Sequence, residues 1–379
     1  MGSLHERSAT WASTSRGVPG EDGFVSAHAG PISSKVDPRL RSREAREAEQ
    51  EERLATGATR AAGAGRRARA EEPDPHRTCF ERDRDRILHS TGFRRLAGKT
   101  QVFVFPADHQ RTRLTHALEV TQVAAAIAAT VGLNVDLVTA QGLAHDVGHT
   151  PGGHSGEPAL ETFVPDFHHA VWGADVSLEP LNLCEETLDG VRCHSWSLPS
   201  PRTPEGQVLS WADRIAYCTH DFEDAVRAGI VHENELPRSV LEVTGRTRTS
   251  QIDSFIAAVV EAVLTTGRIG MRADAAEALA LMRDFNYERI YMRPESVAQG
   301  EAVVAVLRAL VEYYADDPSR IPSDNFPDEQ PLRRAVAYVA GMTDRFAFES
   351  AVELLGWRRD RLPRGIDSPY QGTFTPTMG

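Results

Sequence analysis

Apolar residues recur at helical spacing along most of the chain after about residue 80. Leu118, Val123, Ile127 and Val131, for example, recur at helical spacing, so they are expected to share one face of a helix. A parallel sheet would need strands that alternate with helices, and the sequence has no such alternation and no internal repeat. We therefore predict an all-α fold in which amphipathic helices bury a common core.

Three helices and one short hairpin can be placed from local patterns. The helices are expected over Thr115–Val131, over Val135–His145 with Asn134 as its N-cap, and over Gln207–Ala228. The segment Gln101–Phe105 alternates and ends at a proline, which predicts a strand of a short β-hairpin. Further amphipathic helices follow after residue 252.

The chain divides into three segments by composition. Residues 1–75 are rich in Gly, Ser, Pro, Ala and charge and contain few large apolar residues, which predicts a disordered or low-complexity tail. Residues 76–230 hold the densest helical patterns and are expected to form the catalytic core. Residues 231–379 are expected to complete the fold with C-terminal helices.

Charge and cysteine content restrict the class of protein. The net charge of −12 argues against a protein that coats duplex DNA or an anionic membrane. The four cysteines form no C-x-x-C pair, so neither a disulfide framework nor a thiolate zinc site is expected. The most apolar run, Ala117–Leu133, is broken by polar residues and is too polar to span a bilayer. These features predict a cytoplasmic protein without a membrane partner.

Two histidines and two aspartates form an ordered set on the predicted helices. His116 lies on the first helix, His145 and Asp146 are adjacent at the end of the second, and Asp213 lies on the third. Gly148 provides the backbone freedom that would let both His145 and Asp146 face one ion. Two imidazoles and two carboxylates suit Mn, Fe, Co, Ni or Mg. We therefore predict that these four residues bind one divalent metal ion, Mn²⁺, Mg²⁺ or a similar cation.

Several segments around this set resemble the HD-domain deoxynucleoside triphosphate triphosphohydrolases, typified by bacterial dGTPases. They are RDRDRILHSTGFRRLAGKTQVF, RTRLTHALEV, LAHDVGHTPGGHSGE, ADRIAYCTHDFEDAVRAG and AGMTDRFA. The resemblance covers about residues 80 to 356. It implies an HD-domain helical fold, attack of water at the α-phosphorus of a dNTP, and release of a deoxynucleoside and tripolyphosphate. It also implies a homo-oligomer, often a hexamer.

A histidine and a glutamate follow the HD pair at a spacing that suits proton transfer. His154 and Glu157 are three residues apart, so the carboxylate can hold the imidazole while its free nitrogen takes a proton from water. In similar family members this H-x-x-E pair supports catalysis. His149 is expected to contact substrate, with a role as ligand of a second metal as the alternative.

A second group of residues is expected to bind the substrate. Tyr217 and Asp221 follow Asp213 at intervals of four residues and so share its helix face, while Arg113 and Arg214 are placed to meet phosphate oxygens. The resemblance implies that Tyr217 and Asp221 read the deoxyribose, with Tyr217 excluding a 2′-hydroxyl. The full set of expected substrate contacts is Gln101, Arg113, His149, His169, Arg214, Tyr217 and Asp221.

Two segments depart from the family pattern. The loop after the HD pair has Thr150 and Gly152 where the family has a proline and a phenylalanine, which predicts a looser loop without an aromatic lid. The family segment F-E-H-N appears as Phe167–Ala170, which keeps the histidine, His169, but lacks the glutamate and the asparagine. Base preference and turnover are the properties that these changes affect.

The sequence thus predicts a dNTP triphosphohydrolase with dGTP among its substrates. Two alternatives stay open. One is another HD phosphohydrolase, a phosphodiesterase or alarmone hydrolase, with two metals that use His149 and His154. The other is a catalytically weak dNTP sensor or a protein that binds single-stranded nucleic acid.

Overall fold

The computed structural model describes residues 4–20, 23–28, 36–104, 110–322 and 330–364. The chain divides into two compact units, Met1–Arg41 and Ser42–Gly379. The first unit contains helix α1 (Leu4–Ser13) and an antiparallel pair of two-residue strands, β1 (Val18–Pro19) and β2 (Val25–Ser26). Helix α1 buries none of its residues.

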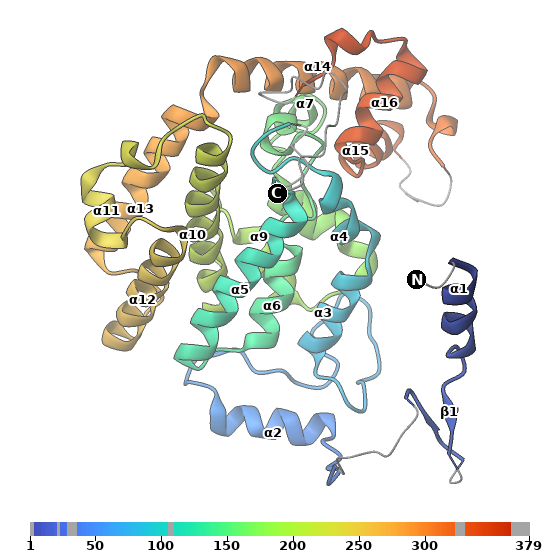
Figure 1. Ribbon diagram of the computed structural model, residues 1–379, viewed down its shortest axis with the longest axis vertical. Coiled ribbons are helices and arrows are strands. Elements are labelled where there is room, and N and C mark those ends of the chain that lie inside the picture. The colour runs from blue at the N-terminus through green and yellow to red at the C-terminus, as the bar shows by residue number, and fades with distance from the viewer. Residues whose placement is uncertain (1–3, 21–22, 29–35, 105–109, 323–329, 365–379) are drawn as a thin grey trace. The chain divides into compact units, whose positions relative to one another are not determined.

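Helices are the only regular elements in the described part of the second unit, apart from two isolated β-bridges (Figure 1). Its α-helices are α2 (Arg43–Arg53), α3 (Cys79–His89), α4 (Thr91–Arg95), α5 (Arg113–Val131), α6 (Val135–Ala144), α7 (Glu157–Glu161), α8 (His169–Trp172), α9 (Glu185–Cys193), α10 (Pro204–Arg227), α11 (Arg238–Thr244), α12 (Arg248–Thr266), α13 (Ala273–Asn286), α14 (Pro294–Asp316), α15 (Pro331–Ala340) and α16 (Asp344–Leu355). Two π-helical turns, Gly173–Ser177 and Tyr287–Tyr291, extend α8 and α13. The all-α prediction is confirmed.

Helices α5, α6 and α10 pack side by side at the centre of this unit (Figure 1). Small residues make the close approach possible, because Ala124 and Ala128 of α5 and Ala212 of α10 belong to one buried cluster. The side chain of Asn134 caps α6 by accepting a hydrogen bond from the Leu137 backbone amide at 3.2 Å, as predicted. The observed bounds of the three helices differ from the predicted ones by at most three residues.

Helix α5 is long and apolar enough to cross a membrane by length and composition alone, although the sequence pattern predicts that this run is too polar. In the structure it packs against α6, α10 and α12. Its buried face carries Val120, Val123 and Ile127, whereas Leu118 points outward and is 48% exposed. The length of α5 is therefore accounted for by its place between helices of the core.

The strand expected over Gln101–Phe105 is not formed in its described part. Residues 101–104 are a series of bends, and Phe105 lies outside the described residues. The backbone amide of Thr100 donates to the Asp344 carboxylate at 2.9 Å, and Phe103 and Val104 are both buried instead of alternating. The only strand pair of the described residues is β1–β2. The prediction of a strand is therefore wrong for residues 101–104, because Phe103 and Val104 both pack into the core.

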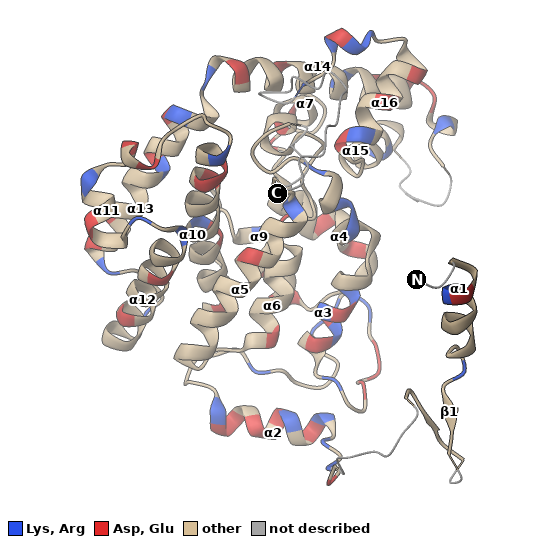
Figure 2. Ribbon diagram, in the orientation of Figure 1, with Lys and Arg blue, Asp and Glu red and all other residues tan. Residues whose placement is uncertain are grey.

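Residues 43–75 belong to the segment that the sequence predicts to be a disordered tail, but in the structure they make hydrogen bonds and bury side chains. Helix α2 presents charged residues along its length (Figure 2) and joins the rest of the unit through polar side chains, among them Gln50, which accepts from the Ala61 amide at 2.9 Å. Ala58 and Ala61 are buried. Composition misses this order because the segment is held mainly by arginine contacts to distant carboxylates and carbonyls and not by large apolar residues.

The most deeply buried of these arginine contacts is made by Arg67, and a substitution there tests whether such contacts stabilise the fold. Its guanidinium pairs with the Asp83 carboxylate at 2.6 Å, and both side chains are fully buried. Replacing Arg67 by Ala leaves Asp83 buried without its partner, so we expect a loss of about 3–5 kcal/mol in the free energy of unfolding. The control is Arg69→Ala, which removes an exposed ion pair with Glu179 and is expected to cost at most about 1 kcal/mol. Equal urea midpoints for the two variants would contradict the prediction.

Candidate metal centre

Three helices bring the predicted ligand set together. His116 comes from α5, His145 caps the end of α6 with Asp146 next to it, and Asp213 comes from α10. The Asp213 Oδ1 atom lies 3.1 Å from His116 Nε2 and 3.7 Å from His145 Nε2. The Asp146 carboxylate lies 3.4 Å from His145 Nε2 and 3.8 Å from His116 Nε2. His116, His145 and Asp146 thus offer ligand atoms within 4.8 Å of one another, and Asp213 lies beside the two histidines.

The chemistry of these atoms suits a cation. His145 Nδ1 donates to the Gly142 carbonyl at 2.7 Å, so its Nε2 presents a lone pair toward the two carboxylates and has no hydrogen-bond partner. Ligand atoms about 2.1 Å from one ion lie roughly 3 Å apart at right angles and about 4.2 Å apart when opposite. The observed separations of 3.1–3.8 Å fall in this range. This donor set fits a divalent ion.

Asp146 lies at the centre of the site. Its Oδ2 accepts from the Arg113 guanidinium at 2.6 Å, and its Oδ1 lies 3.1 Å from His149 Nε2. Burial alone would raise the pKa of Asp146, but His145, His149 and Arg113 hold it well below the usual range. The pKa of Asp213 is likewise lowered, by His116 and His145, against the effect of burial. Both carboxylates are therefore charged at neutral pH, as metal ligands must be.

A second cluster lies beside the first. Glu157 Oε1 accepts from His154 Nδ1 at 2.7 Å and from His169 Nδ1 at 3.0 Å. The predicted pairing of His154 with Glu157 is thus present, and the carboxylate also holds a second imidazole. The His154 side chain is 71% exposed, whereas that of Glu157 is 15% exposed. The free Nε2 of His154 is therefore accessible to a water molecule or a substrate.

Gly148 lets the backbone that carries His169 approach the HD pair. A β-carbon at Gly148 would lie 2.1 Å from the His169 carbonyl oxygen and 2.4 Å from the Gly173 amide nitrogen. Its backbone does not need a positive φ, so the glycine is required by close packing and not by unusual dihedrals. This contact places α8 and its π-helical extension against the end of α6.

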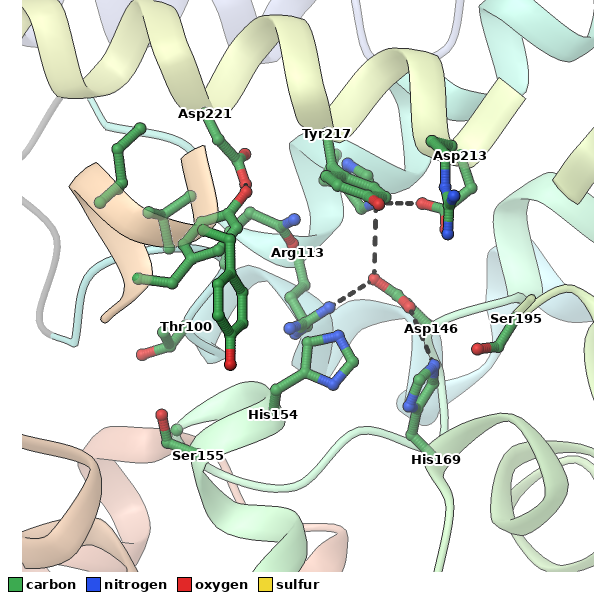
Figure 3. A pocket seen from close by; sticks show the side chains of 18 of the residues that line it. Thr100, Arg113, Asp146, His154, Ser155, His169, Ser195, Asp213, Tyr217 and Asp221 are labelled. Carbon is green, nitrogen blue, oxygen red and sulfur yellow. Dashed lines mark hydrogen bonds and ion pairs between the residues drawn. The ribbon is translucent and has the colours of Figure 1, made fainter. Parts of the chain in front are cut away.

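A cavity of about 510 Å³ opens over the two clusters. Figure 3 shows Asp213, Tyr217 and Asp221 projecting from α10 on one side, with His154 and His169 on the other. Most of the expected substrate contacts line the cavity: Gln101, Arg113, His169, Arg214, Tyr217 and Asp221. The prediction that Tyr217 and Asp221 share one face of a helix with Asp213 is confirmed.

Four of the residues expected to contact the substrate have neighbours in the structure that the sequence did not predict. Arg113 is only 2% exposed, and its guanidinium is already paired with Asp146. His149 is not among the cavity-lining residues; it is buried and stacks on His169, with 3.7 Å between ring centroids. Arg214 covers the Trp196 ring at 3.4 Å, and Gln101 Oε1 is buried without a hydrogen-bond partner. Gln101 therefore has an acceptor free for a substrate hydroxyl.

Several cavity residues were not expected from the sequence. Tyr291 lines the cavity, and its hydroxyl donates to the Asp221 carboxylate at 2.6 Å. The Arg111 guanidinium donates to the same carboxylate, also at 2.6 Å. His194 and Trp196 line the cavity from the segment that follows α9. A histidine directly after a helix, in LDGVRCHS, is the one local signal that could have identified His194, since His145 ends α6 in the same way.

The loop after the HD pair is held firmly, so the expectation of a looser loop is wrong. The Thr150 hydroxyl donates to the Gly153 carbonyl at 2.8 Å, and the Gly152 amide donates to the Asp344 carboxylate at 2.8 Å. Gly152 has φ +72°, and a β-carbon there would lie 2.5 Å from Val303. The threonine and the glycine thus replace the family residues with hydrogen bonds and a close contact to α14.

The chain is similar to known proteins over most of its length. The HD domain model matches residues 113–218, and the phosphohydrolase-associated domain model matches residues 269–352. A protein of Caldanaerobacter subterraneus named deoxyguanosinetriphosphate triphosphohydrolase-like protein is 39% identical over 292 residues, covering 74% of this chain and 86% of its own length. One of the same name from Clostridium perfringens is 38% identical over 299 residues, covering 74% and 87%. A solved structure of a hypothetical protein from Aquifex aeolicus is 19% identical, with a TM-score of 0.48 over 73% of this chain and 69% of that one.

Proposed function

The chain belongs to the deoxyguanosinetriphosphate triphosphohydrolase-like family of HD-domain phosphohydrolases, and from this premise we propose that it hydrolyses deoxynucleoside triphosphates, dGTP among them, to a deoxynucleoside and tripolyphosphate. The observation that carries the proposal is the grouping of His116, His145 and Asp146, with Asp213 beside the two histidines, at a cavity that also holds His154 and three arginines. These four residues would hold a divalent ion such as Mn²⁺ or Mg²⁺.

When bound, the ion supplies a Lewis acid that polarises a phosphate oxygen. The oxygen of a water molecule would bond to the α-phosphorus while the bond from that phosphorus to the 5′-oxygen breaks. His154 Nε2 would take the water proton, while the Glu157 carboxylate accepts a hydrogen bond from His154 Nδ1 at 2.7 Å. The departing 5′-oxygen takes a proton to give the deoxynucleoside, and the three phosphates leave together as tripolyphosphate.

The residues on the other side of the cavity would bind the rest of the substrate. Arg214 would meet phosphate oxygens, and Gln101 and Asp221 would meet the 3′-hydroxyl. Asp221 is held in position by Arg111 and Tyr291 and so needs little rearrangement to accept a hydrogen bond. His169, which shares Glu157 with His154, would face the phosphates.

The reaction can be tested by product analysis. Purified protein would be incubated with each of the four dNTPs and Mn²⁺, and the phosphate products separated by anion exchange. We expect tripolyphosphate and the free deoxynucleoside. Release of pyrophosphate or orthophosphate alone would contradict the proposal and favour another HD phosphohydrolase, whereas tight dNTP binding without products would favour a nucleotide sensor.

Tyr217 gives a prediction about sugar selectivity. Its hydroxyl accepts from Arg283 Nε at 3.2 Å, and burial raises its pKa, so the ring is fixed and neutral against the cavity. Tyr217→Ala would open space for a 2′-hydroxyl, and we expect the preference for dGTP over GTP in kcat/KM to fall by about 10–200-fold. The matched change Tyr287→Ala, at a half-exposed tyrosine of the cavity rim, should leave the preference intact. Unchanged selectivity in Tyr217→Ala would contradict this role.

Three expectations about the wider context stay predictions. Assembly into a homo-oligomer such as a hexamer follows from the resemblance, whereas a cytoplasmic location follows from the composition of the sequence. Binding of single-stranded nucleic acid stays an alternative property of the protein.

A further inference from the structure

Asp344 is a buried carboxylate that accepts hydrogen bonds from two separate segments of the chain. It is the first residue of α16 and is 5% exposed. Its Oδ2 accepts from the Thr100 backbone amide at 2.9 Å and from the Thr100 hydroxyl at 2.5 Å. Its Oδ1 accepts from the Gly152 amide at 2.8 Å. Each oxygen thus holds a different segment, and Asp344 itself is not among the cavity-lining residues.

Each of the two segments continues into a residue that the proposed reaction uses. Gln101 directly follows Thr100 and lines the cavity, and its side-chain oxygen is buried without a hydrogen-bond partner. His154 stands two residues after Gly152 and lines the same cavity. Gln101 is the proposed contact of the 3′-hydroxyl, and His154 is the proposed acceptor of the water proton. The Asp344 carboxylate is therefore bonded beside both of them.

The backbone that leads to His154 depends on such a hydrogen bond. Gly152 and Gly153 both have a positive φ, +72° and +61°, and glycine adopts either sign of φ about equally well. Dihedral preference alone therefore does not fix this loop. A β-carbon at Gly153 would lie 2.9 Å from the Thr100 carbonyl oxygen, so the two segments are in close contact. Asp344 bonds to both sides of that contact.

We propose that Asp344 is a positioning residue that fixes Gln101 and His154 relative to each other, and through them sets the selectivity for a 3′-hydroxyl and the rate of hydrolysis. The inference rests on the proposed function and assigns Asp344 no contact with the substrate. A carboxylate suits this task because both of its oxygens accept hydrogen bonds, and all three groups that meet it are donors. An asparagine there would place its own NH₂ group against one of these donors.

Lys99 holds the same two segments by separate bonds. Its Nζ donates to the His149 carbonyl and, at 2.9 Å, to the Ala340 carbonyl, and its side chain is buried. Lys99 precedes Thr100, and His149 belongs to the loop that leads to Gly152. Because these bonds remain when Asp344 is changed, we expect Asp344→Asn to displace the two segments and not to unfold them.

Selectivity for the 3′-hydroxyl tests the positioning role. The ratio of kcat/KM for dGTP to that for 2′,3′-dideoxyguanosine triphosphate would be measured for the full chain and for Asp344→Asn. We expect this preference for dGTP to fall about tenfold, the value of one well-aligned hydrogen bond, and kcat to fall for both nucleotides. A loss of stability alone would lower both rates and leave the preference unchanged. Gln101→Ala in the Asp344→Asn background should reduce the preference no further, because the two changes act on one contact.

Asp83→Asn is the matched control. The Asp83 side chain is also buried, and its Oδ2 also accepts from a backbone amide, that of Cys184 at 2.8 Å, and from a threonine hydroxyl, that of Thr187 at 2.7 Å. None of these three residues is among those that line the cavity. We expect Asp83→Asn to lose stability and to keep the wild-type preference for dGTP.

The outcomes separate the positioning role from the proposed function. A wild type without the preference for dGTP, or an Asp344→Asn variant that keeps it, would overturn the inference. If Asp344→Asn does not fold, Thr100→Val decides: it removes one of the three hydrogen bonds, and an unchanged preference would overturn the inference. A wild type that releases no tripolyphosphate would refute the proposed function instead. The preference would then be measured as a ratio of dissociation constants, and the same results would decide.

Discussion

Replacing Asp146 by asparagine is expected to abolish hydrolysis, with a fall of at least about 10³-fold in kcat for dGTP, comparable to the loss of a major electrostatic group in other active sites. The carboxylate contacts Arg113 on one side and His145 and His149 on the other. An amide cannot neutralise a divalent ion and a guanidinium together. The variant should therefore also lose bound metal, which metal analysis of the same preparation would show.

A control distinguishes this effect from general damage. Asp136→Asn changes a half-buried aspartate of α6, on the helix that leads to the metal site, and removes only an ion pair with Arg84. Its metal content and kcat should stay near the wild-type values. Wild-type turnover by Asp146→Asn, in a variant whose circular dichroism matches the parent, would remove the basis of the metal hypothesis.

Replacing His154 by glutamine is expected to lower kcat by about 10²–10⁴-fold, the usual contribution of a general acid or base. His154 is exposed to the cavity and held by Glu157 through Nδ1, so its Nε2 is the basic atom nearest to an incoming water. Because His154 is not among the four proposed ligands of the metal ion, the metal content and the KM for dGTP should change little. Steady-state kinetics and metal analysis on one preparation measure both.

Glu157→Gln separates positioning from proton transfer. Glu157 acts through His154, so the variant should lower kcat while shifting the pH–rate profile, since an amide no longer stabilises a charged imidazole. His89→Gln, at an exposed histidine that ends α3, is the control and should keep full activity. A His154→Gln enzyme with wild-type kcat would show that another group takes the proton.

Local sequence patterns accounted for much of the fold. Apolar residues four apart mark α5, and Asn134 marks the start of α6, because a helix closes its hydrogen bonds within four residues and buries one face. The pairing of His154 with Glu157 could be predicted for the same reason, since residues three apart meet on one turn. The order of His116, His145, Asp146 and Asp213 on the predicted helices indicated the metal ligands, because imidazoles and carboxylates together suit a divalent ion.

Other features could not be read from local spacing. The expected strand is not formed over residues 101–104, where Phe103 and Val104 are both buried, and the preceding Thr100 amide bonds to Asp344, a residue 244 positions away. The order of residues 43–75 depends on Arg67 reaching Asp83 in the core. In both cases the competing partner lies far along the chain, where periodicity gives no signal.

The sequence by itself determined the helices, the kinds of ligand and the order in which they occur, because these follow from backbone hydrogen bonding and side-chain chemistry over a few residues. Only the tertiary structure decided which groups face each other: Arg113 against Asp146, and His194 against His169. Such contacts join α5 to the end of α6, and the end of α9 to α8. They depend on how closely the helices pack, and at Gly148 that packing is set by the absence of a single β-carbon.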